Sequence, residues 1–200
     1  MTDIITSELY DDAYCKMIDA KEWRHRLTPP TVKVLYDHFK PTSVVDVGCA
    51  NGLHLKAFKE LGVERLLGIE GTKHWAPYIE KYFDSRYVIE DLRKPLNPLE
   101  PKFDLVFCVE VLEHLEEKYA EQAVKNLIGM GDTLCISACP LTGGFHHVNV
   151  KPRRYWINLF KEHGVNYCND EVDKLQSIFK KMNCSGWFKT GLKVFRNGTK

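Results

Sequence analysis

The sequence predicts a doubly wound α/β domain in which helices cover both faces of a mainly parallel sheet. Short apolar runs alternate with amphipathic segments along most of the 200 residues, which is the order expected of such a sheet. Two runs, Ser43–Val47 and Phe103–Val109, are almost wholly apolar, as strands buried on both faces are. The length fits one domain comfortably and two only with difficulty.

The first elements have clear start and stop signals. Apolar residues recur at helical spacing over Thr31–Phe39, after an N-terminal helical region, and Pro41 ends this helix. The β-branched run Ser43–Val47 predicts the first strand. The next helix is expected over Leu53–Leu61, where Gly62 ends it.

The middle of the chain continues the alternation. Arg65–Glu70 predicts the second strand, and Trp75–Tyr82 predicts a helix that begins near Pro77. Arg86–Glu90 and the apolar run Phe103–Val109 predict the third and fourth strands.

The last part of the chain is less regular. Glu116–Met130 and Pro152–Glu162 each place apolar residues on one helical face, and Thr133–Ala138 predicts a fifth strand between them. Val172–Met182 reads as helical, and Leu192–Phe195 predicts a last strand at the edge of the sheet.

Charge and composition exclude several classes of protein. Lys and Arg number 28 against 27 Asp and Glu, so the net charge of +1 gives no general attraction to nucleic acid or to a membrane surface. No run has the length of a membrane span or a secretory signal, so we expect a cytoplasmic protein. Seven scattered cysteines without a C-x-x-C pair predict reduced, mostly buried thiols.

The first predicted strand leads into a glycine-containing turn, Val44–Gly52. Gly48 lets the backbone turn and lets a ligand approach closely. Asp46 stands at the tip of the strand, where the carboxyl ends of a parallel sheet bind ligands. Ala50 and Leu53 occupy two glycine positions of the dinucleotide fingerprint, which disfavours NAD and FAD.

The D-x-G-x-x-x-G pattern of this turn resembles motif I of class I S-adenosylmethionine-dependent methyltransferases, in which alanine sometimes replaces the middle glycine. Leu66–Glu70 resembles their second-strand motif, whose final acid, here Glu70, holds the ribose hydroxyls. Glu90–Leu92 resembles the motif after the third strand, where Asp91 would accept a hydrogen bond from the adenine amino group. Phe103–Leu115 closely resembles the signature of the fourth strand.

The resemblance implies a Rossmann-like class I methyltransferase fold and S-adenosyl-L-methionine as cofactor. Arg24, His25 and Arg26 form a basic run before the first strand, and an arginine of this run, for which Arg26 is chosen, would clamp the cofactor carboxylate if the N-terminal segment folds over it. A solvated basic cluster is the alternative, and His114 has the alternative of packing against the sheet. The residues expected to bind the cofactor are Asp46, Gly48, Ala50, Asn51, Gly52, Glu70, Gly71, Asp91, Leu92, Cys108, Glu110, His114 and Arg26.

The acceptor end of the site is expected in the loop after the fifth strand. It contains His146 and His147, which are candidate general bases for a hydroxyl acceptor. Adjacent residues of an extended segment point in opposite directions, so we expect only one of the two to face the pocket. The alternative is that both are ordinary loop or partly buried histidines.

The segment His147–Phe160 resembles the corresponding part of methyltransferases from glycan-assembly genes, many of which act on sugar hydroxyls and some of which are viral and of similar length. Tyr155 and Trp156, within it, belong either to the acceptor pocket or to the core. No N/D-P-P-Y/W-type motif follows the fourth strand, where the chain has Val109–Leu112, so an adenine or amine acceptor is not expected.

The functional hypothesis is an S-adenosylmethionine-dependent O-methyltransferase that acts on a sugar hydroxyl of a glycan or nucleotide sugar. The alternatives are a methyltransferase for another small molecule or for RNA, and a non-catalytic subunit that binds the cofactor. We expect a monomer or homodimer with a saccharide or small-molecule partner, without nucleic acid or membrane.

One domain is expected over 1–200, with three parts. These are an N-terminal helical segment over the active site (1–40), the cofactor-binding core (41–140), and an acceptor-side loop with helices and the final strand (141–200). Asp91, Glu110, Glu113 and the loop histidines are dispersed along the sequence, so no metal site is expected.

Overall fold

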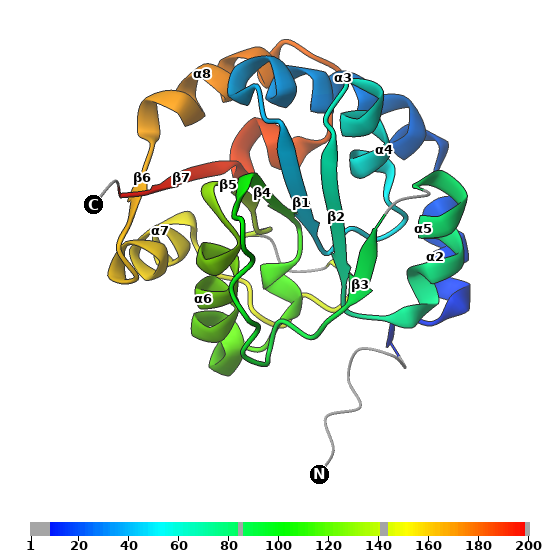
Figure 1. The fold of residues 1–200 in the computed structure, drawn as a ribbon, viewed down its shortest axis with the longest axis horizontal. Helices are drawn as coiled ribbons and strands as arrows, with labels where there is room; N and C mark the ends of the chain where they lie inside the picture. The colour runs from blue at the N-terminus through cyan, green and yellow to red at the C-terminus, as the bar shows by residue number, and fades with distance from the viewer. Residues whose placement is uncertain (1–8, 84–85, 141–143, 199–200) are drawn as a thin grey trace.

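The computed structural model describes residues 9–83, 86–140 and 144–198 and has a seven-stranded sheet in the order β3-β2-β1-β4-β5-β7-β6 (Figure 1). The first five strands are parallel to one another, and β7 is antiparallel to both β5 and β6. The doubly wound, mainly parallel α/β fold predicted from the sequence is confirmed. The beginning of the predicted N-terminal segment (1–8) and the start of the acceptor-side loop (141–143) lie outside the described residues.

The strands are β1 (Ser43–Val47), β2 (Arg65–Glu70), β3 (Tyr87–Ile89), β4 (Phe103–Val109), β5 (Gly131–Ser137), β6 (Val165–Tyr167) and β7 (Lys193–Asn197). The α-helices are α2 (Asp12–Asp19), α3 (Glu22–Phe39), α4 (Leu53–Glu60), α5 (Ala76–Tyr82), α6 (Ala120–Met130), α7 (Arg153–Glu162) and α8 (Asn169–Lys180). Shorter helical turns are η1 (Lys73–Trp75), η2 (Leu112–His114), η3 (Glu117–Tyr119) and η4 (Trp187–Gly191).

The predicted bounds of β1, β2 and β4 agree with the structure, but two features of the sheet differ. The last strand, β7, is not at the edge, because β6 pairs with its outer side. Strand β6 was not predicted, since its three residues, Val165–Tyr167, are too few to form a recognisable pattern. Backbone pairing with β7 therefore makes this segment a strand.

The helix before β1 is longer than predicted. It begins at Glu22 and continues through Pro29 and Pro30, although proline lacks the N–H that a helix interior uses. The hydroxyl of Thr31 donates to the carbonyl of Leu27 at 2.7 Å, inside this part of the helix. Tertiary packing outweighs the local preference here, because the face that follows the prolines is buried in the core.

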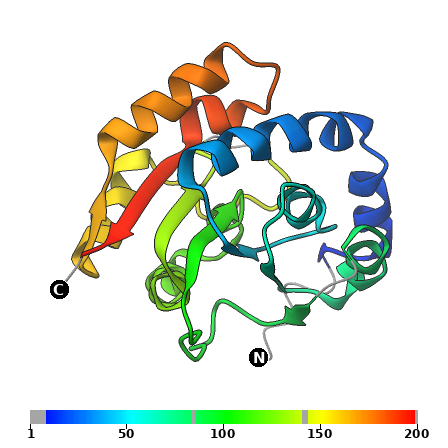
Figure 2. The same ribbon diagram turned by 45° about the horizontal axis from the view of Figure 1, so that its top comes forward.

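The sheet separates two apolar cores, and alternate residues of β1 point to opposite sides. Val44 packs with buried residues of α3, α4 and α8, whereas Val45 and Val47 pack with those of α6 and α7. Figure 1 shows α3, α4 and α8 together along the upper side, with α6 and α7 at the lower left, and in Figure 2 α3 and α8 come forward. Burial on both faces explains why this strand is a continuous apolar run.

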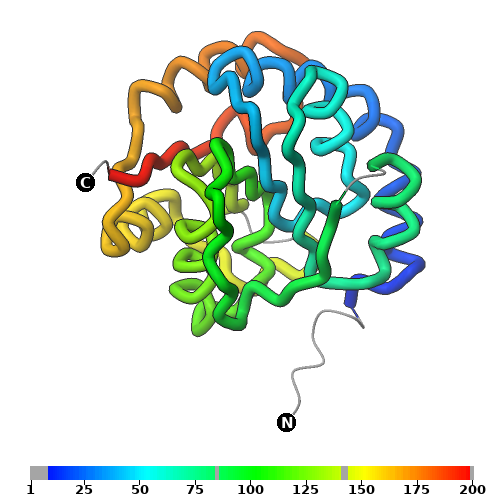
Figure 3. The backbone as a smooth tube through the Cα atoms, in the orientation of Figure 1, coloured from blue at the N-terminus to red at the C-terminus, as the bar shows by residue number. Residues whose placement is uncertain are grey.

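The N-terminal part of the described chain lies over the sheet edge where the site forms. Helix α2 contacts η1, just before α5, and Figure 3 shows it in blue beside α5. His74 Nδ1 of η1 lies 2.7 Å from Asp12 Oδ1 of α2.

Two further expectations from the sequence can be compared with the structure. All seven cysteines are free thiols, and five of them are buried, as expected. Among the described residues, no helix is both long and apolar enough to cross a membrane.

Candidate active site

A pocket opens at the carboxyl ends of the parallel strands. It has an empty volume of about 1100 Å³, part of it open to solvent, which accommodates a nucleoside-sized molecule. The predicted cofactor residues that line it are Gly48, Ala50, Glu70, Gly71, Asp91, Leu92, Glu110 and His114. The lining of the pocket does not include Asp46, Asn51, Gly52, Cys108 or Arg26.

The turn after β1 has a backbone that needs small residues. Gly48 and Gly52 have φ values of 75° and 74°, in the left-handed region that favours glycine. A Cβ atom added to Gly48 would lie 2.3 Å from Cγ2 of Val111. Ala50 also has a positive φ, 48°, at the position where the resemblance led us to expect a glycine. The turn therefore presents bare backbone to the pocket.

Glu70, at the end of β2, holds this turn in place. Its Oε2 accepts the N–H of Ala50 at 2.9 Å, and its Oε1 accepts those of Gly71 at 2.8 Å and Thr72 at 3.3 Å. Burial raises the pKa of Glu70, while these three hydrogen bonds favour the charged form. Because a carboxylate oxygen accepts more than one hydrogen bond, Glu70 can still accept from a ligand in the pocket.

Asp46 lies behind the turn. Its side chain is buried, and Oδ2 has no hydrogen-bond partner among the described residues. Burial raises the pKa of Asp46 well above its usual value, Glu70 raises it further, and Arg24 lowers it. The nearest imidazole is His54, with Nδ1 at 3.7 Å, but burial lowers the pKa of His54 to about 3 and keeps it neutral. Asp46 therefore depends on Arg24 for positive charge.

Asp91 lines the pocket but already has a partner. The guanidinium of Arg93 donates to both of its carboxylate oxygens, with Nε at 2.9 Å from Oδ1 and NH2 at 2.9 Å from Oδ2. Burial raises the pKa of Asp91, but the hydrogen bonds from Arg93 outweigh it and leave the pKa below its usual value. Asp91 is thus a charged acceptor, fixed in orientation, next to the exposed side chain of Glu90.

The predicted cofactor residues that do not line the pocket have structural roles instead. Asn51 Nδ2 donates to Asp19 Oδ1 at 2.9 Å, which connects the turn to α2. Gly52 is the N-cap of α4. Cys108 is fully buried in the core beside α6 and α7, because its side chain points into one face of β4 and not toward the strand end.

In the basic run before β1, Arg24 lines the pocket and Arg26 is exposed. Residues two positions apart in a helix differ by about 200° around its axis, so the side chains of Arg24 and Arg26 leave α3 on opposite sides. Of the two arginines, Arg24 and not the chosen Arg26 has the position expected of a residue that contacts a ligand in the pocket. Arg24 faces Tyr14, Asp46 and Asp19, and burial lowers its pKa.

Replacing Arg24 with alanine is expected to weaken binding of S-adenosylhomocysteine by about 10- to 100-fold, because a buried guanidinium is then lost from the pocket. Arg26→Ala is expected to change the Kd less than twofold. Isothermal titration calorimetry on both variants measures the difference. Equal effects of the two substitutions on the Kd would show that both arginines act only through long-range electrostatic attraction and that neither contacts the ligand.

Several lining residues escaped the sequence analysis because they belong to no motif. Tyr10 and Tyr14 come from the N-terminal part, Trp75 from η1 and Trp187 from η4. Aromatic residues in amphipathic segments are usual core residues, so only the tertiary structure identifies them as pocket walls. Tyr14 stacks on Phe145 with ring centroids 4.5 Å apart, which brings the N-terminal part against the acceptor-side loop.

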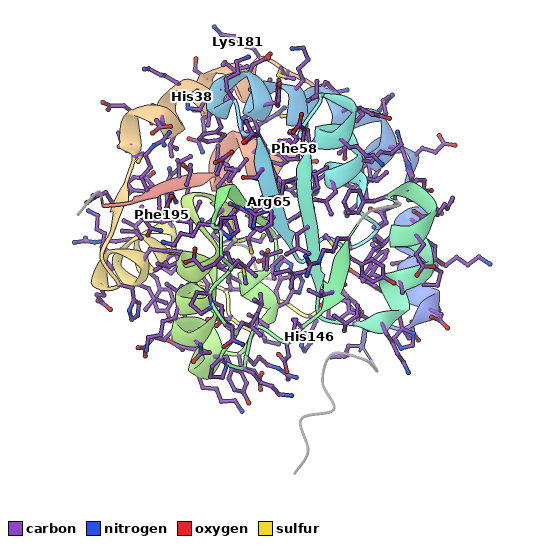
Figure 4. The ribbon with its side chains drawn as sticks, in the orientation of Figure 1. His38, Phe58, Arg65, His146, Lys181 and Phe195 are labelled. Carbon is purple, nitrogen blue, oxygen red and sulfur yellow. The ribbon has the colours of Figure 1, made fainter. Side chains whose placement is uncertain are left out.

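At one end of the pocket, His114 connects the predicted bases to the lining. Its Nδ1 lies 2.8 Å from the hydroxyl of Tyr10 and 3.1 Å from the carbonyl oxygen of His146. Its ring packs edge-on against His147, with centroids 4.9 Å apart. Neither His146 nor His147 belongs to the lining itself. Figure 4 shows His146 far from His38, which lies near α8.

The dispersal of the acidic and histidine residues along the sequence does not keep them apart. Glu113, His114 and His147 bring possible metal-ligating atoms within 4.8 Å of one another, and so do Glu110, Glu113 and Cys139. The argument that dispersal excludes a metal site is therefore wrong, because the fold places the ends of β4 and β5 side by side.

Comparisons with known proteins agree with this geometry. Residues 45–130 match the family described as "Methyltransferase domain". No curated protein matches the chain. A solved O-methyltransferase family protein from Burkholderia thailandensis is similar in fold, with a TM-score of 0.68 and 13% identity over 97% of this chain. The chain covers 63% of that protein, less than two thirds of its length.

Two other solved structures are similar over most of both chains. The N-methyltransferase NodS from Bradyrhizobium japonicum, in complex with S-adenosyl-L-homocysteine, has a TM-score of 0.63 and 19% identity, covering 96% of this chain and 95% of NodS. A TehB-like S-adenosylmethionine-dependent methyltransferase from Corynebacterium glutamicum has a TM-score of 0.68 and 16% identity, covering 94% and 100%. At these identities the likeness shows a shared fold.

Proposed function

We propose that this chain is an S-adenosylmethionine-dependent methyltransferase that methylates a hydroxyl group of a sugar; the domain match over residues 45–130 and the fold shared with NodS support the methyltransferase activity. The observation that carries the proposal is the position of the two loop histidines. His114 lines the cofactor pocket and contacts both of them, through the carbonyl of His146 and the ring of His147. A polar acceptor end thus lies directly beside the cofactor pocket.

The reaction needs a proton acceptor and good alignment. The acceptor O–H gives its proton to His146 or His147, and the oxygen attacks the methyl carbon as the carbon–sulfur bond breaks. The sulfonium takes the electron pair and becomes a neutral thioether. The pocket supports this step by offering the donor a site between the turn at Gly48, Glu70 at the end of β2 and Asp91 after β3, with Glu110 beside them.

The charges at this end favour a hydroxyl-rich acceptor. Glu110 and the hydroxyl of Tyr10, which line the pocket with His114, offer hydrogen-bond acceptors at this end. A sugar presents several hydroxyl donors to such a surface at once. The sugar class of the acceptor rests on this chemistry and on the resemblance of His147–Phe160 to glycan methyltransferases.

Replacing His146 and His147 together with alanine is expected to lower turnover at least about 100-fold and to leave the Kd for S-adenosylhomocysteine within threefold, because the bases lie outside the cofactor pocket. The assay follows transfer of a labelled methyl group to nucleotide sugars and oligosaccharides. His163→Ala, on the far end of α7, is the matched control.

The same assay separates the alternatives. Methylation of tRNA, an amine or a phenol but of no sugar would overturn the sugar acceptor. Binding of S-adenosylmethionine without turnover on any acceptor would make the chain a non-catalytic subunit. One similar structure is a putative methyltransferase from Haloferax volcanii in complex with the Trm112 activator, so a negative result is to be repeated with an activator of that kind added.

A further inference from the structure

Three segments that are distant in sequence meet beside the cofactor pocket. Glu113 and His114 follow β4, Cys139 follows β5, and His147 precedes α7. Backbone hydrogen bonds join them, since the N–H groups of Val148 and Asn149 both donate to the carbonyl of Glu113 at 3.0 Å. The loop that carries His147 is therefore fixed against the residues after β4.

The side chains at this junction have the spacing of ligands around one ion. Possible ligating atoms of Glu113, His114 and His147 lie within 4.8 Å of one another. Two ligands about 2.1 Å from the same ion are roughly 3–4 Å apart, so small rotations of the side chains suffice. Glu110 belongs to the same place, because its carboxylate lies within 4.8 Å of that of Glu113.

Glu113 has an unused carboxylate oxygen. Its side chain is 0% exposed, and Oε1 accepts the N–H of Cys139 at 3.0 Å. Oε2 is buried and has no hydrogen-bond donor among the described residues. An unpaired carboxylate in such a place is costly, and a cation would remove this cost.

The protein itself supplies little positive charge here. The ammonium group of the buried Lys193 is close enough to interact with Glu110 and Glu113, and its Nζ donates to the carbonyl of Gly191 at 2.9 Å. One ammonium group beside two carboxyl groups leaves room for a divalent cation.

His114 is oriented like a metal ligand. Its Nδ1 lies 3.1 Å from the carbonyl oxygen of His146 and 2.8 Å from the hydroxyl of Tyr10, and in the tautomer with the hydrogen on Nδ1 both oxygens can accept it. The lone pair is then on Nε2, on the other side of the ring. Histidines that bind metals usually donate their other ring N–H to a carbonyl or carboxylate in this way.

We propose that Glu113, His114 and His147, with Glu110 beside them, bind a divalent cation that holds two neighbouring hydroxyls of the acceptor sugar. The proposal rests on the proposed function for the identity of the acceptor. The cation activates one hydroxyl by stabilising the alkoxide that forms as its proton leaves. A cation-bound His147 has no free lone pair, which makes His146 the proton acceptor.

The ligand set favours a transition metal. Imidazole nitrogens suit Zn²⁺, Co²⁺ and Fe²⁺, and carboxylates suit Mn²⁺, whereas Mg²⁺ and Ca²⁺ prefer oxygen ligands alone. We expect Mn²⁺, Co²⁺ and Zn²⁺ to bind more tightly than Mg²⁺ or Ca²⁺.

The test is direct titration of the chelator-treated, full-length protein with Mn²⁺, followed by calorimetry and by the electron paramagnetic resonance of free Mn²⁺. One ion per chain is expected. Glu113→Gln and His147→Gln are expected to weaken binding at least tenfold, and the matched surface changes Glu121→Gln and His163→Gln are expected to leave it unchanged. Circular dichroism shows whether Glu113→Gln, which alters the bond to Cys139, still folds; His147→Gln tests the site if it does not.

The measurements separate this inference from the proposed function, because metal binding needs no acceptor. A folded wild-type protein that binds none of Mn²⁺, Co²⁺ and Zn²⁺, or a His147→Gln variant that binds Mn²⁺ as the wild type does, overturns the site. Stoichiometric binding lost in the variants supports it even if no sugar is methylated. Sugar methylation that persists in strong chelator would retain the proposed function and overturn the role of the cation.

Discussion

Replacing Gly48 with alanine is expected to lower the free energy of unfolding by about 4 kcal/mol and to reduce the affinity for S-adenosylhomocysteine at least 100-fold. The φ of 75° costs an alanine about 1–2 kcal/mol, and the added Cβ meets Cγ2 of Val111 at 2.3 Å, which adds about 1–3 kcal/mol of overpacking. Relief of the clash moves the backbone that lines the pocket. Urea denaturation and calorimetry measure the two effects.

Two other glycines separate the causes. Gly62 has a φ of 91° but nothing within 4 Å of a new Cβ, so Gly62→Ala is expected to show the backbone strain alone, about 1–2 kcal/mol. Gly186 has an ordinary φ and an equally open Cβ position, so Gly186→Ala is expected to be near neutral. If Gly48→Ala binds S-adenosylhomocysteine within threefold of the wild type, the turn does not hold the cofactor closely.

Trp156→Ala is expected to lower the free energy of unfolding by about 3–5 kcal/mol. The side chain is fully buried and packs in the core beside α6, with the ring of Tyr155 5.1 Å away. The sequence left open whether it is core or acceptor pocket, and the structure makes it core. Urea denaturation gives the loss, and at a low temperature, where the variant is folded, cofactor affinity is expected to be unchanged.

Two substitutions are controls for this change: a smaller truncation at the same position, and the same truncation at an exposed tryptophan. The indole Nε1 of Trp156 has no hydrogen-bond partner among the described residues, so Trp156→Phe loses volume but no hydrogen bond and is expected to cost about 1–2 kcal/mol. Trp23→Ala, at a side chain that is 36% exposed, is expected to cost less than 1 kcal/mol. A folded Trp156→Ala protein of near-normal stability that has lost turnover would place this residue in the acceptor pocket instead.

Local patterns accounted for much of the fold. The apolar runs at β1 and β4 predicted strands with the observed bounds, because apolar residues fill most positions of a strand that is buried on both faces. Helix stop signals were equally predictable, because a residue such as Gly62, with its φ of 91°, ends the helix through its own backbone conformation. The prolines of α3 misled the same reasoning, since packing of the residues that follow them outweighed the missing N–H groups.

The sequence by itself determined the doubly wound sheet, the glycine turn at its carboxyl edge and the order of the acids along that edge. Each of these features depends on residues that are close together in the sequence, because their spacing and backbone preferences determine local structure. Only the tertiary structure decided the place of β7 inside the sheet, the choice of Arg24 over Arg26, and the meeting of Glu113, His114 and His147. These depend on contacts between distant segments, which the period of a sequence does not encode.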